Sequence, residues 1–201
     1  MNAMKKLLGT LAAATLGLAV FASGANAGSA APSQQDSIVI VPASAGPVDE
    51  QAPASTFRRG KVVAFETTAQ AGDIVVLTRQ NRLYFVLGNG KAVMYRVATA
   101  KKGFEWKGSH AVTAKAKWPD WRPPASMRKR RPDLPAFMAG GPDNPLGARA
   151  LYLGSSIYRI HGTNEPSSIG KAASSGCIRM LNEDVTELYR HVKLGARVSV
   201  L

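Results

Sequence analysis

The stretch from residue 74 to residue 98 most constrains the fold, because it has the pattern of three consecutive strands. Short apolar runs at 74–77 and 83–87 are separated by polar residues, which is typical of strands. Gly88-Asn89-Gly90 follows, a strong signal for a tight turn. Val93, Tyr95 and Val97 then recur at every second position, the period of a strand with one buried face. We therefore predict a three-stranded meander.

More strands are predicted on both sides of a long loop. Residues 110–118 alternate, which puts His110, Val112 and Ala114 on an apolar face and Lys115 on the other. Residues 119–148 are rich in Pro and Gly and have no long periodic run. A loop of that length in a compact domain usually serves as a lid or a binding wall. Strands are expected again at 149–153, 157–161 and 197–201.

One clear helix is predicted near the C-terminus. Val185, Leu188 and Val192 form an apolar stripe at helical spacing. Asn182 is a candidate N-cap, and Gly195 is a typical stop. The predicted class is mainly β, with one or two helices.

The first 27 residues have the pattern of a cleaved secretory signal peptide. Lys5 and Lys6 precede an apolar run at 7–21, and the segment ends in Ala25-Asn26-Ala27. The run is shorter than the roughly 20 residues that span a bilayer, so no transmembrane anchor is expected after cleavage. Residues 28–56 are rich in Ala, Pro, Ser and Gln and predict a flexible linker, although the run at 38–41 could add a strand. The folded domain is expected at 57–201.

The net charge of the chain is +13, which favours polyanionic partners. Since the chain is expected to be exported, anionic wall polymers are better candidates than nucleic acid. The run from Arg128 to Arg131 is interpreted as a solvated basic loop.

The chain has a single cysteine, Cys177, so an internal disulfide is excluded. Such a residue is a small buried apolar group, a partner in an intermolecular disulfide, or a reactive thiol. Small residues surround it, and the backbone N–H groups of Gly176 and Cys177 are candidates for an oxyanion hole. His161, at the end of a predicted strand, is the candidate base. The spacing of the two residues permits contact without establishing it. The scattered histidines do not have the ligand spacing of a zinc site.

Two motifs carry a resemblance to a known family. They are His161-Gly162-Thr163 and the run from Ser174 to Met180, which has the sequence Ser-Ser-Gly-Cys-Ile-Arg-Met. Together with the flanking segments 118–124 and 141–151, this pattern closely resembles the catalytic domain of the L,D-transpeptidases over roughly 72–201. The family often has His where this chain has Ser175. The resemblance implies a β-sandwich-like fold with the site in a cleft under the long loop.

The resemblance also implies the chemistry. Cys177 would be the nucleophile, His161⁺ would stabilise its thiolate, and the carbonyl of Gly162 would orient the imidazole. Ser174, Ser175, Arg179 and Trp121 are candidates for substrate binding, although Ser174 would equally suit a role in loop shape, and Arg179 a salt bridge within the site.

The implied substrate is the tetrapeptide stem of peptidoglycan, attacked with release of terminal D-alanine in the periplasm and without a cofactor. The acyl acceptor stays open between a neighbouring stem, a lysine of an outer-membrane lipoprotein, and water. A noncatalytic wall-binding module is the alternative from another class.

Overall fold

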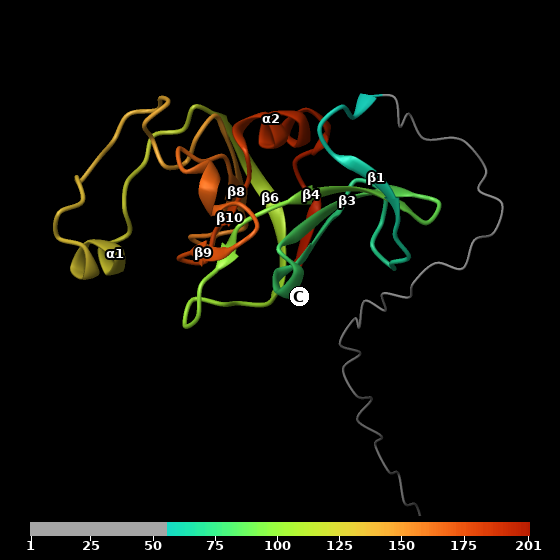
Figure 1. The fold of residues 1–201 in the computed structure, drawn as a ribbon, viewed down its shortest axis with the longest axis horizontal. Coiled ribbons are helices and arrows are strands. Elements are labelled where there is room, and N and C mark those ends of the chain that lie inside the picture. Colours follow the sequence, from blue (N-terminus) through green and yellow to red (C-terminus); the bar gives the residue numbers. More distant parts are fainter. Residues whose placement is uncertain (1–55) are drawn as a thin grey trace, which may run out of the picture. The chain divides into compact units, whose positions relative to one another are not determined.

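A computed structural model of the chain describes residues 56–201 (Figure 1). The predicted signal peptide, nearly all of the predicted linker and the run at 38–41 lie outside these residues, so those interpretations stay predictions. Within the described part, no helix is long and apolar enough to cross a bilayer.

The described residues form one large sheet and one small sheet. The large sheet has nine strands in the order β1-β4-β3-β2-β11-β6-β7-β8-β10, and β5 pairs with β9 in the small one. The strands are β1 Lys61–Ala64, β2 Ile74–Leu77, β3 Arg82–Gly88, β4 Lys91–Arg96, β5 Thr99–Ala100, β6 Gly108–Lys117, β7 Arg149–Leu153, β8 Arg159–His161, β9 Ala172–Ser174, β10 Ile178–Arg179 and β11 Arg197–Val200.

The predicted meander is confirmed. Strands β2, β3 and β4 pair in sequence and antiparallel. The turn between β3 and β4 has positive φ at Gly88, Asn89 and Gly90 (87°, 50° and 66°), a region that Gly and Asn tolerate better than other residues. The polar stretch between β2 and β3 contains a short 3₁₀ turn, η2 Thr78–Gln80.

Strand β6 joins the two halves of the large sheet, because it pairs with β11 through its first residues and with β7 through its later ones. Its pairing with β7 shifts register between Val112 and Ala114. This irregularity corrects the predicted faces: Val112 is buried as expected, but Ala114 is exposed. Lys115 points to the opposite side from the one predicted, and its Nζ donates to two carbonyl oxygens near the end of the C-terminal helix, both at 2.6 Å.

One hydrophobic core lies between the two halves of the sheet and the helix α2 Asn182–His191. Val185, Leu188 and Val192 are buried in it, as the helical stripe predicts. Figure 1 shows α2, in red, lying across the sheet near β6 and β8. The predicted class, mainly β with one or two helices, is confirmed by this arrangement and by a second, short helix.

Residues 119–148 form an arm that projects from the sheet (Figure 1). Contrary to prediction, part of the basic run is helical: α1 spans Ala125–Arg130 and has no buried residue. The base of the arm is closed by Asn144, which is buried and whose Nδ2 donates to the carbonyl oxygens of Pro119, Met138 and Ala139 at 3.1, 3.2 and 3.0 Å. The arm is therefore fastened at its base and exposed beyond it.

The segment before β1 is held by one carboxylate on α2. Glu187 is only 5% exposed, and it accepts hydrogen bonds from the backbone N–H groups of Arg58, Arg59 and Gly60 at 2.7 to 3.2 Å. The hydroxyl of Tyr95 donates to it as well, at 2.9 Å. Burial acts to raise the pKa of Glu187, but these hydrogen bonds outweigh burial and the pKa is lowered.

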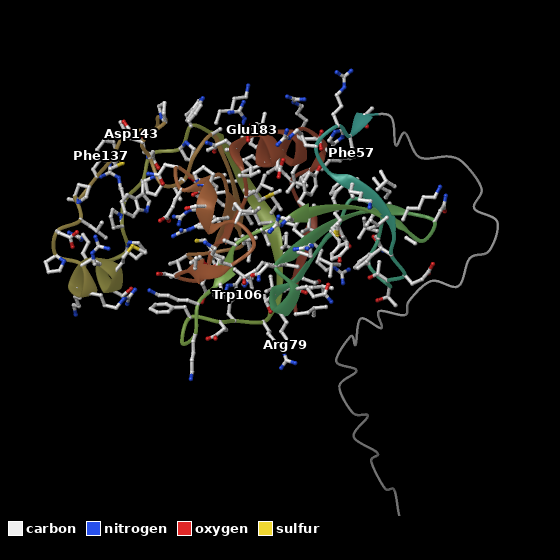
Figure 2. The ribbon with its side chains drawn as sticks, in the orientation of Figure 1. Phe57, Arg79, Trp106, Phe137, Asp143 and Glu183 are labelled. Atoms are coloured by element: carbon white, nitrogen blue, oxygen red, sulfur yellow. The ribbon has the colours of Figure 1, made fainter. Side chains whose placement is uncertain are left out.

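We expect Glu187→Ala to lower the free energy of unfolding by about 3 kcal/mol, because several buried donors would lose a charged acceptor at once. The measurement is chemical unfolding at pH 7. The control is Glu183→Ala on the same helix, labelled in Figure 2, whose side chain is exposed and whose loss should cost under about 1 kcal/mol. Equal losses for the two variants would contradict the anchoring role of Glu187.

Candidate active site

The site is built on a short parallel pair of strands, β8 and β10. Ile160 lies opposite Ile178, and His161 lies opposite Arg179. Both isoleucines point into the hydrophobic core. Since side chains alternate between the two faces of a strand, the residues on either side of them point the other way. Cys177 immediately precedes β10, so that the same register puts it beside Arg159.

This outward face opens into a cleft of about 540 Å³, within the range of ligand sites. The arm forms one wall, through Trp121, Met127, Arg130, Arg131 and Leu134. The opposite wall includes His161, Cys177, Arg159 and Arg179. The predicted base and nucleophile, 16 positions apart in the sequence, therefore line one cleft beneath the predicted loop.

His161 is held in one orientation. Its Nδ1 lies 2.6 Å from the carbonyl oxygen of Gly162, the contact expected from the sequence. A carbonyl can only accept, so Nδ1 carries the proton and Nε2 has a lone pair. The side chain is 4% exposed, and burial is the main cause that lowers its pKa from 6.5 to about 3. The positive charges of Arg179 and Arg159 lower it further, against the hydrogen bonds to backbone carbonyls. The imidazole is therefore neutral at pH 7.

Asn182 fixes the loop that carries this carbonyl. Its Oδ1 accepts from the N–H groups of Ala148 and Thr163 at 2.9 and 3.2 Å, and its Nδ2 donates to the Thr163 carbonyl at 3.0 Å. The prediction of Asn182 as N-cap is wrong: Leu181 holds that position, without a side-chain cap. A Cβ at Gly162 would lie 2.2 Å from Asn182 Oδ1, which explains why glycine follows His161.

Cys177 is half-buried. Its Sγ is 3.9 Å from the carbonyl oxygen of Ile157, a long and weak contact. Burial raises the pKa of the thiol, and hydrogen bonding and positive charge from Arg159, followed by the charge of Arg179, only partly offset this. The thiol is therefore protonated at neutral pH.

The raised pKa of Cys177 and the lowered pKa of His161 contradict the expectation of a resting thiolate stabilised by His161⁺. A buried thiol with a raised pKa and a buried imidazole with a lowered pKa both favour the neutral form. Both shifts have the same cause, which is loss of water around a charge. A charged pair would therefore form only when a proton moves during a reaction.

The loop before Cys177 is held from inside, which changes two predicted roles. Ser174 is buried, and its hydroxyl donates to the Cys177 carbonyl at 2.5 Å and accepts from the Gly176 N–H at 3.1 Å. Ser174 lines the cleft, but its hydroxyl serves the loop rather than a ligand. The N–H of Gly176, predicted as an oxyanion-hole donor, donates to the Ser174 hydroxyl in this structure. The N–H of Cys177 stays a candidate.

Two aromatic residues that sequence reasoning missed support the same loop. Trp106 and Tyr158 stack with their ring centroids 4.3 Å apart, and Trp106 Nε1 donates to the Gly176 carbonyl at 2.7 Å. Gly176 has φ of +114°, and a Cβ there would lie 2.6 Å from the Tyr158 ring. The glycine before Cys177 is thus required both by its backbone conformation and by this contact.

The other predicted ligand-binding residues lie in the cleft. Ser175, Arg179 and Trp121 line it, whereas Trp118 lies in a separate depression and is 44% exposed. Arg179 Nη1 is 3.1 Å from a carboxylate oxygen of Glu165, so the salt bridge within the site is present. Within residues 56–201, no group of three or more His, Cys, Asp or Glu side chains is arranged to hold a metal ion.

A cysteine immediately before β10 and a neutral, carbonyl-oriented histidine on β8, in one cleft, are the arrangement of a cysteine acyl-transfer site. The sequence-family model of the L,D-transpeptidase catalytic domain (YkuD) matches residues 71–200. The chain therefore belongs to the L,D-transpeptidase catalytic-domain family.

Curated relatives agree with this assignment. Probable L,D-transpeptidase ErfK/SrfK of Escherichia coli (strain K12) is 37% identical over 135 residues, covering 64% of this chain and 43% of that protein. Probable L,D-transpeptidase YbiS of the same strain is 36% identical over 137 residues, covering 64% and 44%. The match thus spans less than half the length of these relatives.

Solved structures support the fold. An L,D-transpeptidase of Enterococcus faecium superposes with a TM-score of 0.53 at 14% identity, covering 66% of this chain and 50% of that one. L,D-transpeptidase 3 of Mycobacterium tuberculosis gives a TM-score of 0.52 at 16% identity, covering 72% and 70%.

The buried neutral histidine predicts a loss of stability in mild acid. The pKa of His161 is lower in the folded chain than in the unfolded chain, so between pH 6.5 and about pH 3 the unfolded chain binds the extra proton. The contribution of the neutral His161 to the free energy of unfolding is complete above pH 6.5 and falls as the pH falls through this window. At pH 5 the loss from this group should be about 2 kcal/mol.

The measurement is the unfolding free energy of the native chain and of His161→Gln at pH 7 and pH 5. The variant should lose about 2 kcal/mol less over this interval than the native chain. An unchanged dependence on pH in His161→Gln would contradict a buried neutral imidazole.

Proposed function

We propose that this protein is a cysteine L,D-transpeptidase that acts on the tetrapeptide stems of peptidoglycan. Cys177 attacks the carbonyl of the third residue of the stem, the terminal D-alanine leaves, and a thioester holds the acyl group. An amine then takes the acyl group from the sulfur. The observation that carries the proposal is the placement of Cys177 and a carbonyl-oriented His161 on one face of the β8–β10 pair, open to the cleft.

His161 supplies the proton transfers. Its Nδ1–H is committed to the Gly162 carbonyl, so Nε2 accepts the thiol proton as the sulfur attacks. The same nitrogen returns the proton to the amine of D-alanine as the C–N bond breaks. General acid–base catalysis of this kind contributes roughly 10²- to 10⁴-fold to the rate.

The backbone N–H of Cys177 is our candidate donor to the developing oxyanion. Such a donor contributes about 10²- to 10³-fold when it is fixed before reaction. Ser174 fixes this part of the loop, because its hydroxyl bonds both the Cys177 carbonyl and the Gly176 N–H. The role of Ser174 is therefore to hold the donor in place.

The charge of the cleft supports an acidic peptide as substrate. Lys101, Arg130, Arg131, Arg159 and Arg179 line it, and Glu165 is the one acidic residue among the lining residues. Since Glu165 pairs with Arg179, the cleft carries an excess of positive charge. Stem peptides carry several carboxylates, which such a cleft attracts and orients.

The acyl acceptor and the location of the enzyme complete the proposal. We infer that the acceptor is the amine of a neighbouring stem, which gives a 3–3 cross-link, and that the enzyme works in the periplasm after export. A lysine amine of an outer-membrane lipoprotein or water would use the same first half of the reaction.

The test is incubation of the purified protein with tetrapeptide stems, followed by mass analysis. The native chain should release D-alanine and form dimers, whereas Cys177→Ser should do neither. His161→Ala should lower the rate of D-alanine release by at least about 10²-fold. His110→Ala, a histidine on β6 outside the residues that line the cleft, should keep the native rate per folded molecule.

Thermal unfolding of each variant separates chemistry from folding. Release of D-alanine at the native rate by folded His161→Ala would contradict its role as base. Tripeptide without dimer would identify water as the acceptor, that is, a carboxypeptidase. No release by the native chain would favour a noncatalytic wall-binding module.

A further inference from the structure

Arg159 has an unused hydrogen-bond donor at the site. Within residues 56–201, its Nε is the one buried side-chain nitrogen or oxygen that lacks a hydrogen-bond partner. A buried donor without an acceptor costs roughly 1–3 kcal/mol, and such groups in native proteins require an explanation. The reaction proposed above uses Arg159 only as one of several cleft cations, so its donor needs a separate account.

The guanidinium and the cysteine sulfur are close neighbours. Arg159 Nη1 donates to the carbonyl oxygen of Ile157 at 3.0 Å, and Cys177 Sγ lies 3.9 Å from the same oxygen. The strand register agrees, because Ile160 pairs with Ile178 and the residues before them, Arg159 and Cys177, are therefore adjacent. Among the influences that favour ionisation of the thiol, a hydrogen bond to the Arg159 backbone is the largest; the charge of the Arg159 guanidinium comes next, ahead of its side-chain hydrogen bond and the charge of Arg179.

We propose that Arg159 is the cation that stabilises the Cys177 thiolate, with its Nε donating to the sulfur once the thiol proton has moved to His161. The inference rests on the proposed function in taking Cys177 as the nucleophile. The S–H bond breaks as the N–H bond forms on His161 Nε2, and the charge left on sulfur supplies the acceptor that Arg159 Nε lacks in the resting protein.

Arg179 is less suited to this role, although it lies on the same face. Its guanidinium is paired with the Glu165 carboxylate at 3.1 Å, and that negative charge offsets its own. For Arg159, no ion pair with a carboxylate is present in the described residues. Its guanidinium lies over the ring of Tyr152, 5.2 Å from the centroid, which leaves its charge uncompensated.

The other groups around the sulfur explain why a thiolate needs a cation other than His161. His161 is the proposed base, but its pKa is about 3, so in the resting protein it carries no charge that could stabilise a thiolate. Lys101, Arg130 and Arg131 face the cleft from the other elements, together with Glu165. Arg131 is paired with Asp133, and the charged groups of Lys101 and Arg130 lie over the ring of Phe104, 5.2 and 4.8 Å from its centroid. Arg159 is therefore the fixed positive charge beside the nucleophile.

The experiment measures the pKa of Cys177 in the full chain. Iodoacetamide alkylates only the thiolate, and the chain has a single cysteine, so the pH dependence of the alkylation rate reports this group alone. Arg159→Gln should raise the apparent pKa by about one unit or more. Arg159→Lys, which keeps the charge, should fall between the native chain and Arg159→Gln.

The control is Arg131→Gln, the same change at an exposed arginine of the cleft that pairs with Asp133. It should leave the pKa of Cys177 close to the native value. If Arg159→Gln does not fold, Arg159→Met keeps the apolar stem and should show the same rise. An unchanged pKa in a folded, uncharged variant overturns the proposal, and if the KM for tetrapeptide rises with it, Arg159 binds a substrate carboxylate instead.

The alkylation measurement needs no transpeptidase activity. The role of Arg159 and the proposed function can therefore each be contradicted without the other. A raised pKa in Arg159→Gln together with an inactive native chain would support Arg159 as the partner of the thiolate and count against the proposed reaction. An unchanged pKa in an active enzyme would do the reverse.

Discussion

The parallel pairing of β8 and β10 is the contact on which the site depends. It consists of two residue pairs, with the Met180 N–H donating to the His161 carbonyl at 2.8 Å just beyond them. So short a ladder has little stability of its own. Its register is fixed because Ile160 and Ile178 must both enter the core, and a slip by one residue would turn every side chain to the wrong face. The hydrophobic core thus determines which side chains face the cleft.

The same burial that fixes the geometry sets the protonation states. Removing water from the cleft disfavours any isolated charge, so both reacting groups are neutral at rest. In the proposed reaction, proton transfer separates charge inside a poorly solvated site, where fixed donors and cations have a large effect. Arginine suits this setting because it stays charged at every physiological pH. In the proposed reaction His161 provides the proton transfer, and the surrounding groups determine the energy of that transfer.

Those parts of the fold and of the candidate site that depend on a single periodicity or motif could be predicted from the sequence. The meander followed from period-two alternation and a Gly-Asn-Gly turn, and the two motifs brought Cys177 and His161 to one cleft. Lys115 was placed on the wrong face because an irregularity inside β6 shifts the register without any local signal. The roles of Asn182 and Trp106 depend on partners 19 and 70 positions away, which no local pattern contains. The sequence could have indicated Arg159, since it lies two positions before His161 on one strand and therefore shares a face with it. Its charge was not related to the sulfur of Cys177 from the sequence alone.

The arm from 119 to 148 differs from the rest of the domain in how it is attached. Asn144 and a backbone bridge between Trp121 and Met138 close its base, and the helix beyond that base buries no residue. Changes of length or composition at its tip therefore leave the core, the strand register and the reacting groups unaffected. Because the arm forms one wall of the cleft, evolution can reshape what the cleft admits at almost no cost in folding. The side chains of the β8–β10 pair and the wall that the arm presents to a ligand can therefore change independently of each other during evolution.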